Sequence, residues 1–599
     1  MFNPQHFYNS RGDGFPVLEI TEPKASGPEQ GRRFVPLQRT ELSGRVTGPV
    51  ADLTLVQRFG FSAAESTEVV EALYRFPLPG DAAVRGVTVR FGEVEIRAEL
   101  KPRAEAEAAY AEAKKAGQQA ALATRAGPNI FTLQVAGLRP DEPVTVETHF
   151  VQLAQAAGNG WSLRVPLTLA PRYVRADEAS GRAPGKATEQ LPFGLLRDPG
   201  HRFALDLAMA GAVSIRSTGY ALAVEASGET AQVRLADGEV IPDRDLVLSW
   251  TPPYAAERPV LHVLAHDDPA AGVVYFLAQV APPQVTAGDP PRRELTLLVD
   301  HSGSMSGPKW EAADWATEQL LRGLTPEDAF GLAVFHNTPF WFERQLQPGT
   351  PRTVENAVAW LKGRTDSGGT ELGVALEQAL HLPTGSGDTR AVLIVTDGQV
   401  TDHARLLQLA DREFASPQRR RISVLCIDSA PNDFLALQLA ERGGGVARFL
   451  TSSPDEGDIT TALDEILADW SAPALAGLRL AVDRGEVHAV GRRAVDAAEP
   501  GWRAVDLGDL PAGRVLWVAG WAPRGEGGPL TLRLELGNGT GVAGTAAAAG
   551  DFPALAALVA ARRIIELEYL AQAHTLEPVE IERRLRELGY GGPQLEPAV

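Results

Sequence analysis

The chain has 599 residues, of which 44% are hydrophobic and 22% are charged. This composition is typical of a globular protein with sizeable cores, and it excludes intrinsic disorder of the whole chain. The formal net charge is −19 and the sequence has no long basic run, so we expect no binding to nucleic acid. Apolar stretches stay well short of the roughly 18 residues that a membrane helix needs, so we expect no membrane span.

Residues 38–260 predict mostly β structure. Short alternating or β-branched runs, such as Val84–Phe91 and Val144–Leu153, are separated by Gly, Pro and Asp, a pattern that is typical of strands and turns. Ala104–Ala116 is rich in Ala, Glu and Lys and predicts a helix among these strands. The spacing favours a β-sandwich, and residues 174–200 predict a long loop.

The pattern changes after a Pro-rich linker at 281–293. Apolar strands without polar alternation, such as Leu295–Val299 and Ala391–Thr396, then alternate with helices of roughly 10–15 residues. This alternation predicts a doubly wound α/β domain, with a mainly parallel sheet that helices cover on both faces. Strands return after Trp470, and an apolar helix capped by Asp551 is followed by a second short helix, which we expect to be a packing element.

The single cysteine, Cys426, excludes an intramolecular disulfide and any cysteine-based metal cluster. It lies in an apolar run, so we expect a buried structural thiol rather than a reactive one. The first residues show no basic segment followed by an apolar one, so a secretory signal is not visible and a cytoplasmic location is expected. An extracellular location stays open.

Polar side chains follow the first strand of the predicted α/β domain. Asp300, Ser302 and Ser304 alternate directly after Leu295–Val299 and before a helix. Residues two apart in an extended turn project to one side, so the carboxylate and the two hydroxyls can converge. The pattern alone is weak, but the carboxyl end of a parallel strand is where such folds bind ligands. Hard oxygen donors of this kind suit Mg²⁺.

Two later segments can complete this set of oxygen donors. The segment SGGT (367–370) offers the hydroxyl of Thr370, and Asp397 follows another apolar strand. Two close carboxylates repel each other, so either a cation binds between Asp300 and Asp397 or one of them stays protonated. The alternative interpretation is that all these positions are only helix caps and turn residues.

Together these segments resemble a known site. DHSGSMSG (300–307), SGGT (367–370) and VTDG (395–398) are similar to the metal-ion-dependent adhesion site of von Willebrand factor A domains, and the resemblance covers about 290–470. It implies that Mg²⁺, with Mn²⁺ or Ca²⁺ as alternatives, is coordinated by five side chains, some of them through water. These are Asp300, Ser302, Ser304, Thr370 and Asp397.

The N-terminal region resembles the vault protein inter-alpha-trypsin (VIT) domain through YRFPLP (74–79), the helix around Tyr110 and the segment NIF (129–131). The combination is similar to inter-alpha-trypsin inhibitor heavy chains and their bacterial relatives, although the Asp-Pro-His motif at which those heavy chains are cleaved does not occur. The resemblance implies five regions: a VIT domain at 14–155, a β extension packed with it at 156–260, a von Willebrand factor A domain at 290–470, a C-terminal β region at 471–545, and C-terminal helices at 551–590.

The function implied by this resemblance is non-enzymatic, Mg²⁺-dependent protein binding, as in an adhesion, adaptor or scaffold protein. The cation would leave one coordination position open for an Asp or Glu carboxylate of a partner protein. The chain has no H-E-x-x-H, P-loop or G-x-S-x-G motif, which agrees with a protein that is not an enzyme.

Two other functions stay open. One is a metal-assisted hydrolase, in which His301 or His336 would supply a base. The other is a structural subunit that assembles into a homo-oligomer through the metal site.

A run of aromatic residues, Phe340-Trp341-Phe342, lies beyond the second strand of the α/β domain. We expect these side chains to pack against the core behind a short edge strand. An exposed partner surface is the alternative.

Overall fold

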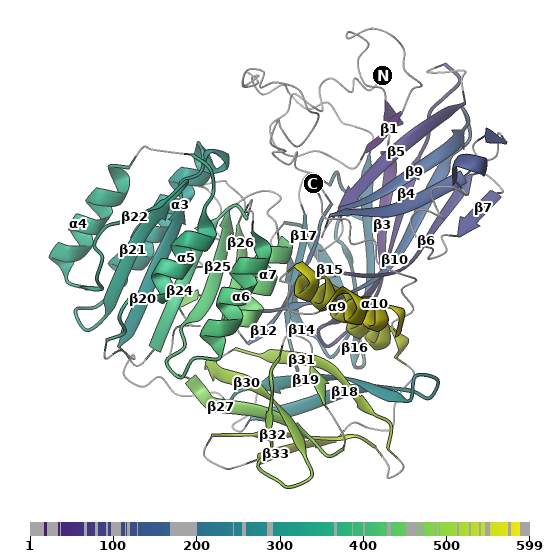
Figure 1. Cartoon of the computed structure of the whole chain (residues 1–599). Helices are drawn as coiled ribbons and strands as arrows, with labels where there is room; N and C mark the ends of the chain where they lie inside the picture. The colour runs from purple at the N-terminus through teal and green to yellow at the C-terminus, as the bar shows by residue number, and fades with distance from the viewer. Residues whose placement is uncertain are drawn as a thin grey trace. The chain divides into compact units, whose positions relative to one another are not determined.

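The computed structural model describes most of the chain, and its description begins at Val17. The described residues are 17–20, 34–35, 37–64, 69–77, 82–91, 94–97, 110–113, 115–116, 120–127, 130–157, 159–167, 201–217, 219–242, 245–253, 259–283, 292–364, 368–385, 387, 389–398, 400, 402–427, 433–450, 463, 466–467, 470, 473–484, 487–489, 492–511, 514–525, 529–537, 541–545, 552–572 and 577–587. The chain divides into two compact units (Figure 1). Unit 1 comprises 1–154, 162–250 and 576–599, and unit 2 comprises 155–161 and 251–575.

Unit 1 is built mainly from β-sheets, as the sequence predicts. Its largest sheet has eight strands in the order β15-β16-β13-β3-β4-β10-β6-β7, and among these described strands only the β13–β3 pair is parallel. These strands are β3 (Leu37–Thr47), β4 (Val50–Phe59), β6 (Ala83–Phe91), β7 (Val94–Arg97), β10 (Val144–Leu153), β13 (Arg202–Ala210), β15 (Leu222–Ser227) and β16 (Thr230–Leu235).

Further sheets complete unit 1. One has the order β2-β1-β5-β9-β8, and another joins β12, β17 and β14. Their strands are β1 (Val17–Ile20), β2 (Phe34–Val35), β5 (Val70–Pro77), β8 (Ala120–Gly127), β9 (Ile130–Leu138), β12 (Gly160–Val165), β14 (Val213–Ser217) and β17 (Leu246–Thr251). The predicted loop at 174–200 lies outside the described residues, and so does the first part of the predicted helix, residues 104–109.

The eight-stranded sheet buries one face of each central strand. In β4, Leu53, Leu55 and Phe59 are at most 3% exposed, whereas Arg58 is exposed. This alternation of buried and more exposed side chains is what a half-buried antiparallel sheet requires.

The end of the predicted helix, from Tyr110, is helical, and the Tyr110 hydroxyl donates to Glu71 Oε1 at 2.8 Å. Burial and this carboxylate raise the pKa of Tyr110 above its ordinary value.

Unit 2 contains the predicted doubly wound α/β domain. Its main sheet has the order β22-β21-β20-β24-β25-β26, with parallel pairing throughout except for the antiparallel edge strand β22. The strands are β20 (Arg293–Asp300), β21 (Ala329–Phe335), β22 (Pro339–Trp341), β24 (Thr389–Thr396), β25 (Arg421–Ile427) and β26 (Gly444–Leu450), and the short β23 (Gln347–Pro348) also pairs with β21.

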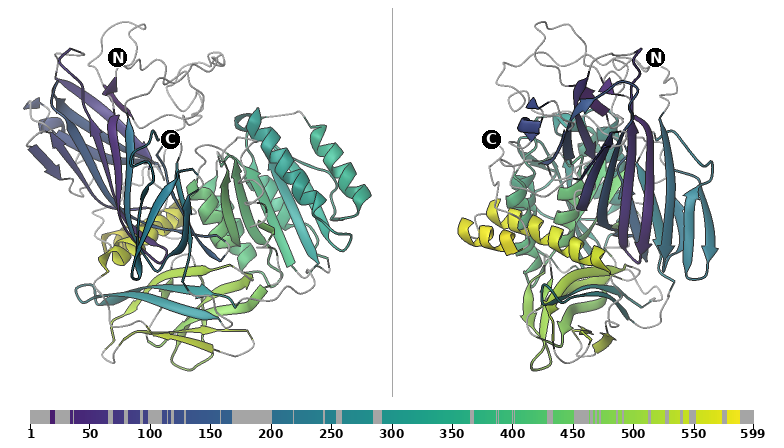
Figure 2. Two further views of the ribbon diagram at one scale, coloured as in Figure 1. Left: turned by 180° about the vertical axis from the view of Figure 1, so that it is seen from behind. Right: turned by 90° about the vertical axis from the view of Figure 1, so that its right-hand side faces the viewer.

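Helices cover both faces of this sheet (Figures 1 and 2). One apolar core joins β20 to α3 (Pro308–Arg322) and α4 (Pro351–Lys362), and a second joins it to α5 (Leu372–Leu380), α6 (His403–Phe414) and α7 (Asp433–Gly443). Leu297 belongs to the first core and its neighbour Leu298 to the second, and both are at most 1% exposed. A strand buried on both faces has no place for polar alternation, which explains its apolar sequence.

A β-sandwich completes unit 2, and the α/β domain is inserted into its sequence. One sheet, β18-β19-β31-β28, packs through a common core on the other, β29-β30-β27-β32-β33. Two strands precede the α/β domain: β18 (Val260–Asp268) and β19 (Val273–Ala281). The others follow it: β27 (Pro473–Val482), β28 (His488–Ala489), β29 (Ala494–Asp496), β30 (Arg503–Pro511), β31 (Leu516–Pro523), β32 (Thr531–Glu535) and β33 (Gly541–Thr545).

Two helices end the described part of the chain, α9 (Pro553–Gln572) in unit 2 and α10 (Pro578–Glu587) in unit 1. The α9 guanidinium groups of Arg562 and Arg563 lie 4.6 and 4.1 Å from the ring centres of Trp517 and Trp521 on β31. α9 thus packs against β31 through these two cation–aromatic contacts. Across the described helices, none has both the length and the apolar character to cross a bilayer. Cys426 is buried and forms no disulfide, as predicted.

Candidate functional site

Asp300 ends β20 at the carboxyl edge of the α/β sheet, and its side chain is fully buried. Its Oδ1 accepts a hydrogen bond from the backbone N–H of Ser302 at 2.8 Å, which folds the chain into a turn directly after the strand. Its Oδ2 accepts from the hydroxyl of Thr396, the last residue of β24, at 2.6 Å. Burial, and secondly the nearby Asp397 carboxylate, raise the pKa of Asp300 to about 7.

Ser302 and Ser304 lie in this turn with their hydroxyls together. Their Oγ atoms are 3.1 Å apart, and Ser302 is almost fully buried. A single 3₁₀ turn, Gly303–Met305, follows the strand, and the fully buried Met305 anchors it in the core beneath. Both hydroxyls therefore come from a turn that is fixed at its start by Asp300 and at its end by Met305.

The segment that contains Thr370 runs beside the same turn. Gly303 N–H donates to Gly368 O at 2.9 Å, and Ser302 and Gly368 form a parallel bridge. On the other side, Gly369 N–H donates to Asn337 Oδ1 at 2.7 Å. A Cβ atom on Gly368 would lie 2.5 Å from Asn337 Nδ2, so a larger residue here would have to displace the Asn337 side chain. Thr370 directly follows these residues, whereas Ser367 lies outside the described part of the chain.

Asp397 completes the edge. It directly follows β24, the parallel neighbour of β20, and the register pairs Val299 with Val395 just before the two carboxylates. Asp397 is fully buried, and its Oδ2 accepts from the ammonium group of Lys309 at 3.3 Å. The carboxyl ends of neighbouring parallel strands therefore bring two buried carboxylates to one place, as the topology dictates.

Four of the five predicted residues thus lie together, and the fifth, Thr370, is in the segment that pairs with Ser302. Two carboxylates with nearby hydroxyls are hard oxygen donors, and this donor set fits Mg²⁺. Among the described residues, no three His, Cys, Asp or Glu side chains gather as a metal cluster, so a cation here would rely on hydroxyls or water for its remaining ligands. Metal coordination itself stays a prediction.

Three residues that contact the site were not predicted from the sequence. Thr396 donates to Asp300, Lys309 pairs with Asp397, and Asn337 holds Gly369. Thr396 belongs to the VTDG motif and Lys309 lies two residues after DHSGSMSG, so their positions were a usable signal. Asn337 carries no such signal, because it lies beyond β21 and reaches the site only through the tertiary fold.

The histidine between the first two predicted ligands does not belong to the site. His301 is fully buried, its Nε2 lies 2.9 Å from Asp314 Oδ1 on α3, and its ring centre is 3.9 Å from that of Trp310. His336 accepts from the backbone N–H of Asn337 at 2.8 Å through its Nδ1. The two candidate bases are thus engaged in contacts that organise the α/β domain.

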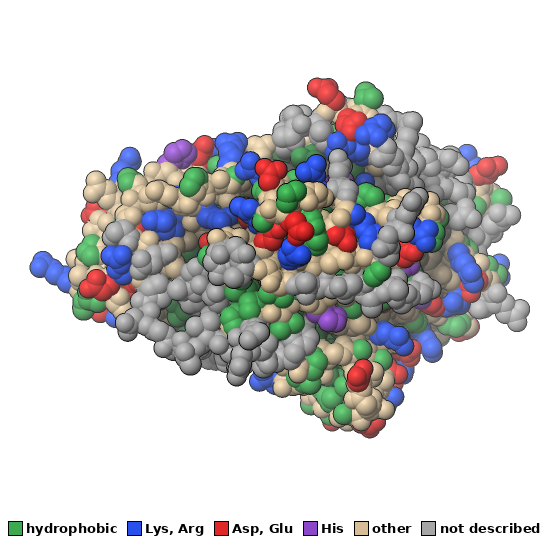
Figure 3. Space-filling model, turned by 90° about the horizontal axis from the view of Figure 1, so that it is seen from below, with side chains coloured by type: hydrophobic (Ala, Val, Ile, Leu, Met, Phe, Trp, Pro, Cys, Tyr) green, Lys and Arg blue, Asp and Glu red, His purple; other side chains and the backbone are tan. Residues whose placement is uncertain are grey.

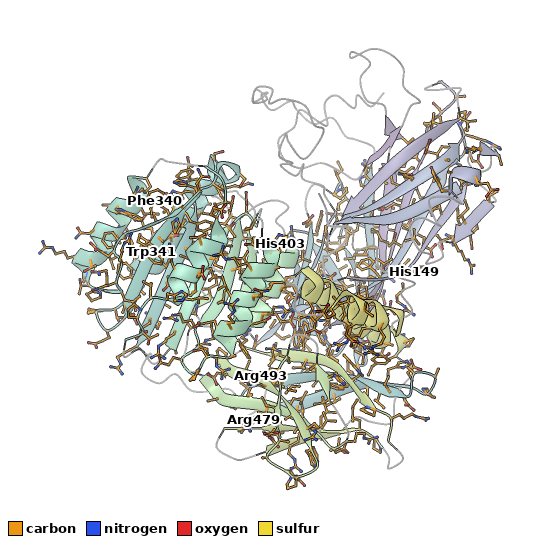
Figure 4. The ribbon with its side chains drawn as sticks, viewed as in Figure 1. His149, Phe340, Trp341, His403, Arg479 and Arg493 are labelled. Atoms are coloured by element: carbon orange, nitrogen blue, oxygen red, sulfur yellow. The ribbon has the colours of Figure 1, made fainter. Side chains whose placement is uncertain are left out.

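The aromatic run packs as expected. Phe340 and Trp341 lie on the edge strand β22 (Figure 4), and all three side chains of the run are half-buried. Phe340 and Phe342 pack against one core and Trp341 against the other, where its indole N–H donates to Gln378 Oε1 at 2.8 Å.

On the face of the molecule in Figure 3, basic and acidic side chains are interspersed.

Comparison with known proteins agrees with these two regions. Residues 37–150 match the model of the vault protein inter-alpha-trypsin domain, and residues 293–449 match that of the von Willebrand factor type A (VWA) domain. The chain therefore carries a VIT domain followed by a VWA domain, with helices at its C-terminal end.

Among the relatives is rat von Willebrand factor A domain-containing protein 5A, which is 25% identical over 443 residues, 67% of this chain and 52% of that protein. Human inter-alpha-trypsin inhibitor heavy chain H4 is 27% identical over 217 residues, 34% of this chain and 22% of that protein. The chain thus spans about half the length of the 5A proteins that it matches. A solved structure, von Willebrand factor type A from Catenulispora acidiphila, is 16% identical with a TM-score of 0.38, covering 55% of this chain and 83% of that one.

Proposed function

We propose that this chain, which joins a VIT domain to a VWA domain, is a non-enzymatic protein that binds a partner carboxylate through Mg²⁺ at the edge of the VWA sheet. Proteins with VWA domains typically mediate protein–protein interaction or adhesion. The proposal adds the cation, with Mn²⁺ or Ca²⁺ as alternatives, and the chemical class of the partner group, an exposed Asp or Glu.

One observation carries this proposal: two fully buried carboxylates, Asp300 and Asp397, meet at the ends of neighbouring strands beside two serine hydroxyls. Burying two negative charges side by side is costly unless a cation compensates them. When bound, Mg²⁺ would supply a strong local positive charge to a chain whose net charge is −19, and so make carboxylate binding favourable.

Different residues of this chain would have different roles in holding the cation. Asp300 and Asp397 would hold the cation directly or through water, and Ser302, Ser304 and Thr370 would add neutral oxygens. Thr396 and the backbone N–H of Ser302 orient the Asp300 carboxylate by donating to its two oxygens. Because His301 is fully buried against Trp310, we assign no proton-transfer role to it, which favours binding over hydrolysis.

Metal binding is tested by calorimetric titration of the EDTA-treated full chain with Mg²⁺. We expect the wild type to bind, Asp300→Asn to lose binding, and Thr370→Ala to bind more weakly because only a neutral oxygen is lost. The matched control is Asp206→Asn, which removes an acid that is 56% exposed on β13 of unit 1 and should leave binding unchanged. Full binding by Asp300→Asn would contradict this site.

Partner binding is tested with the immobilised full chain in a lysate. Partners should be retained in Mg²⁺, released by EDTA, and absent from the Asp300→Asn column. Light scattering of the chain alone, with and without EDTA, distinguishes self-assembly from binding of another protein. If retention is equal in Mg²⁺ and EDTA, binding does not use the cation and the proposal is wrong.

A further inference from the structure

The first turn of α3 carries a positive charge where a helix disfavours one. Gly307 caps this helix, Pro308 is its first residue, and Lys309 is its second. The N-terminal end of a helix has unpaired N–H groups and a partial positive charge, which favour acidic side chains and disfavour basic ones. Lys309 is therefore placed against the field of its own helix, where Glu311 of the same turn has the favoured charge, and Lys309 pairs with a negative group from another segment.

That negative group is Asp397. The ammonium nitrogen of Lys309 lies 3.3 Å from Asp397 Oδ2, its side chain is only 19% exposed, and Asp397 is fully buried. Asp300, the other buried carboxylate, lies close enough to Asp397 to be influenced by its charge. The lysine thus places a single positive charge at the pair of carboxylates that the proposed function assigns to a divalent cation.

We propose that Lys309 is a tethered counter-ion that competes with the divalent cation for Asp397 and thereby lowers the metal affinity of the site. This inference rests on the proposed function, because it concerns the same two carboxylates. An ammonium group and a divalent cation repel each other when they share one carboxylate. Metal binding therefore requires the ammonium group to leave Asp397, and the flexible four-carbon stem of lysine allows it to do so.

The competition has two consequences of opposite sign. Without metal, Lys309 compensates part of the buried negative charge and stabilises the VWA domain. With metal, it is a charge that must be displaced. Removing the charge of Lys309 should therefore lower the melting temperature in EDTA and raise the affinity for Mg²⁺. A lysine that served only to fix the first turn of α3 would show the first effect and lack the second.

The test is calorimetric titration of the EDTA-treated full chain with Mg²⁺ alone, without any partner. We expect Lys309→Met, which keeps the length and removes the charge, to bind Mg²⁺ about tenfold more tightly than the wild type, an effect of about 1.4 kcal/mol. Lys309→Gln should act in the same direction, which guards against a folding defect in the first variant. Lys309→Arg keeps the charge and should keep the affinity within about threefold of the wild type.

The matched control is Lys362→Met at the end of α4. Lys362 makes an ion pair with Glu318 at 2.6 Å, its side chain is 57% exposed, and it belongs to the same domain. This variant should leave the affinity for Mg²⁺ unchanged.

The outcomes separate the two proposals. If the wild type binds Mg²⁺ and both Lys309→Met and Lys309→Gln bind it equally or more weakly, Lys309 is no competitor, whereas the proposed metal site stands. If neither the wild type nor the uncharged variants bind Mg²⁺ or Mn²⁺, both proposals are wrong. Binding by the uncharged variants alone would support competition in its strongest form.

Discussion

The sheet of the VWA domain and the eight-stranded sheet of unit 1 use polar residues in opposite ways. β20 is buried on both faces from Glu294 to Asp300, so its chemistry is confined to the strand end. β10 alternates, and its more exposed side chains interact along the sheet: Glu147 forms an ion pair with Arg90 and a hydrogen bond with His149. A two-sided parallel sheet confines charge to the ends of its strands, whereas a one-sided antiparallel sheet spreads it over a face.

The largest expected effect comes from a buried ion pair in the VWA domain. Asp328 accepts hydrogen bonds from Arg293 and Thr325 and is almost fully buried. Asp328→Ala leaves the largely buried Arg293 guanidinium without this carboxylate and should cost about 3–5 kcal/mol of domain stability. The exposed Asp206–Arg234 pair of unit 1 should contribute less than about 1 kcal/mol. Urea denaturation of the full chain, with proteolysis assigning each transition to a unit, measures both, and equal costs would contradict the comparison.

Adjacent residues on one strand test whether both faces are buried. Leu297→Ala and Leu298→Ala should each cost about 2–5 kcal/mol, because the two side chains lie in different cores. On β4, Phe59→Ala should cost about 3–5 kcal/mol, whereas its exposed neighbour Arg58→Ala should stay within about 0.5 kcal/mol. The same denaturation measurement applies. If either leucine variant hardly lowers the free energy of unfolding, the face of the VWA sheet that carries that leucine is not fully buried.

The two regions should also respond to pH with opposite signs. In unit 1, burial and secondly Arg202 lower the pKa of His201 from 6.5 to about 4, so its contribution to stability is complete above pH 6.5 and is lost as the pH falls toward 4. The effect is on the order of 3 kcal/mol. His201→Gln should remove this dependence. An unchanged pH profile of unit 1 in that variant would assign the dependence to another group.

In the VWA domain, the pKa of Asp300 is raised from 3.8 to about 7, so in EDTA its contribution favours folding below pH 4 and is lost as the pH rises through 7. Asp300→Asn should flatten this part of the profile. Denaturation in EDTA at a series of pH values, again assigned to each unit, measures both slopes. A rise in VWA stability with pH that depends on Asp300 would have the wrong sign.

The smallest expected effect is stabilisation by the cation. A ligand at a hundredfold excess over its dissociation constant stabilises the state that binds it by about 2.7 kcal/mol. Hydrogen exchange of the full chain with Mg²⁺ should therefore slow in the VWA domain, including the segments around Asp300, Gly368 and Asp397, and stay unchanged in unit 1. Asp300→Asn is the control that should show no change. Protection that appears only in unit 1 would place the cation elsewhere.

The elements of the VWA domain were predictable because their sequence signals are local. The predicted strands Leu295–Val299 and Ala391–Thr396 lie within β20 and β24, and helices alternate with the strands as the pattern indicates. The site followed from the same reasoning, since a polar motif after an apolar strand lies at the sheet edge whatever the details of packing.

The β-sandwich of unit 2 was not predictable in the same way. β19 pairs with β18 on one side and with β31 on the other, and β31 lies more than 200 residues later in the chain, across the inserted VWA domain. No local pattern in the sequence indicates which distant strand pairs with β19, because any strand with alternating polarity could pair at the edge of a sheet. The sequence therefore predicted a β region at 471–545 by itself, and only the tertiary structure supplies the two strands that precede the VWA domain.

The sequence by itself determined the doubly wound domain, the positions of Asp300 and Asp397 at neighbouring strand ends, and the burial of Cys426. Each depends on hydrophobic period and chain order, which a linear sequence contains. The tertiary structure decided which groups meet these carboxylates. It turned His301 toward Asp314, brought Thr396 to Asp300, and placed Lys309 against Asp397. Such contacts depend on the direction of each side chain within a turn, and a rotation of one residue redirects it to another partner.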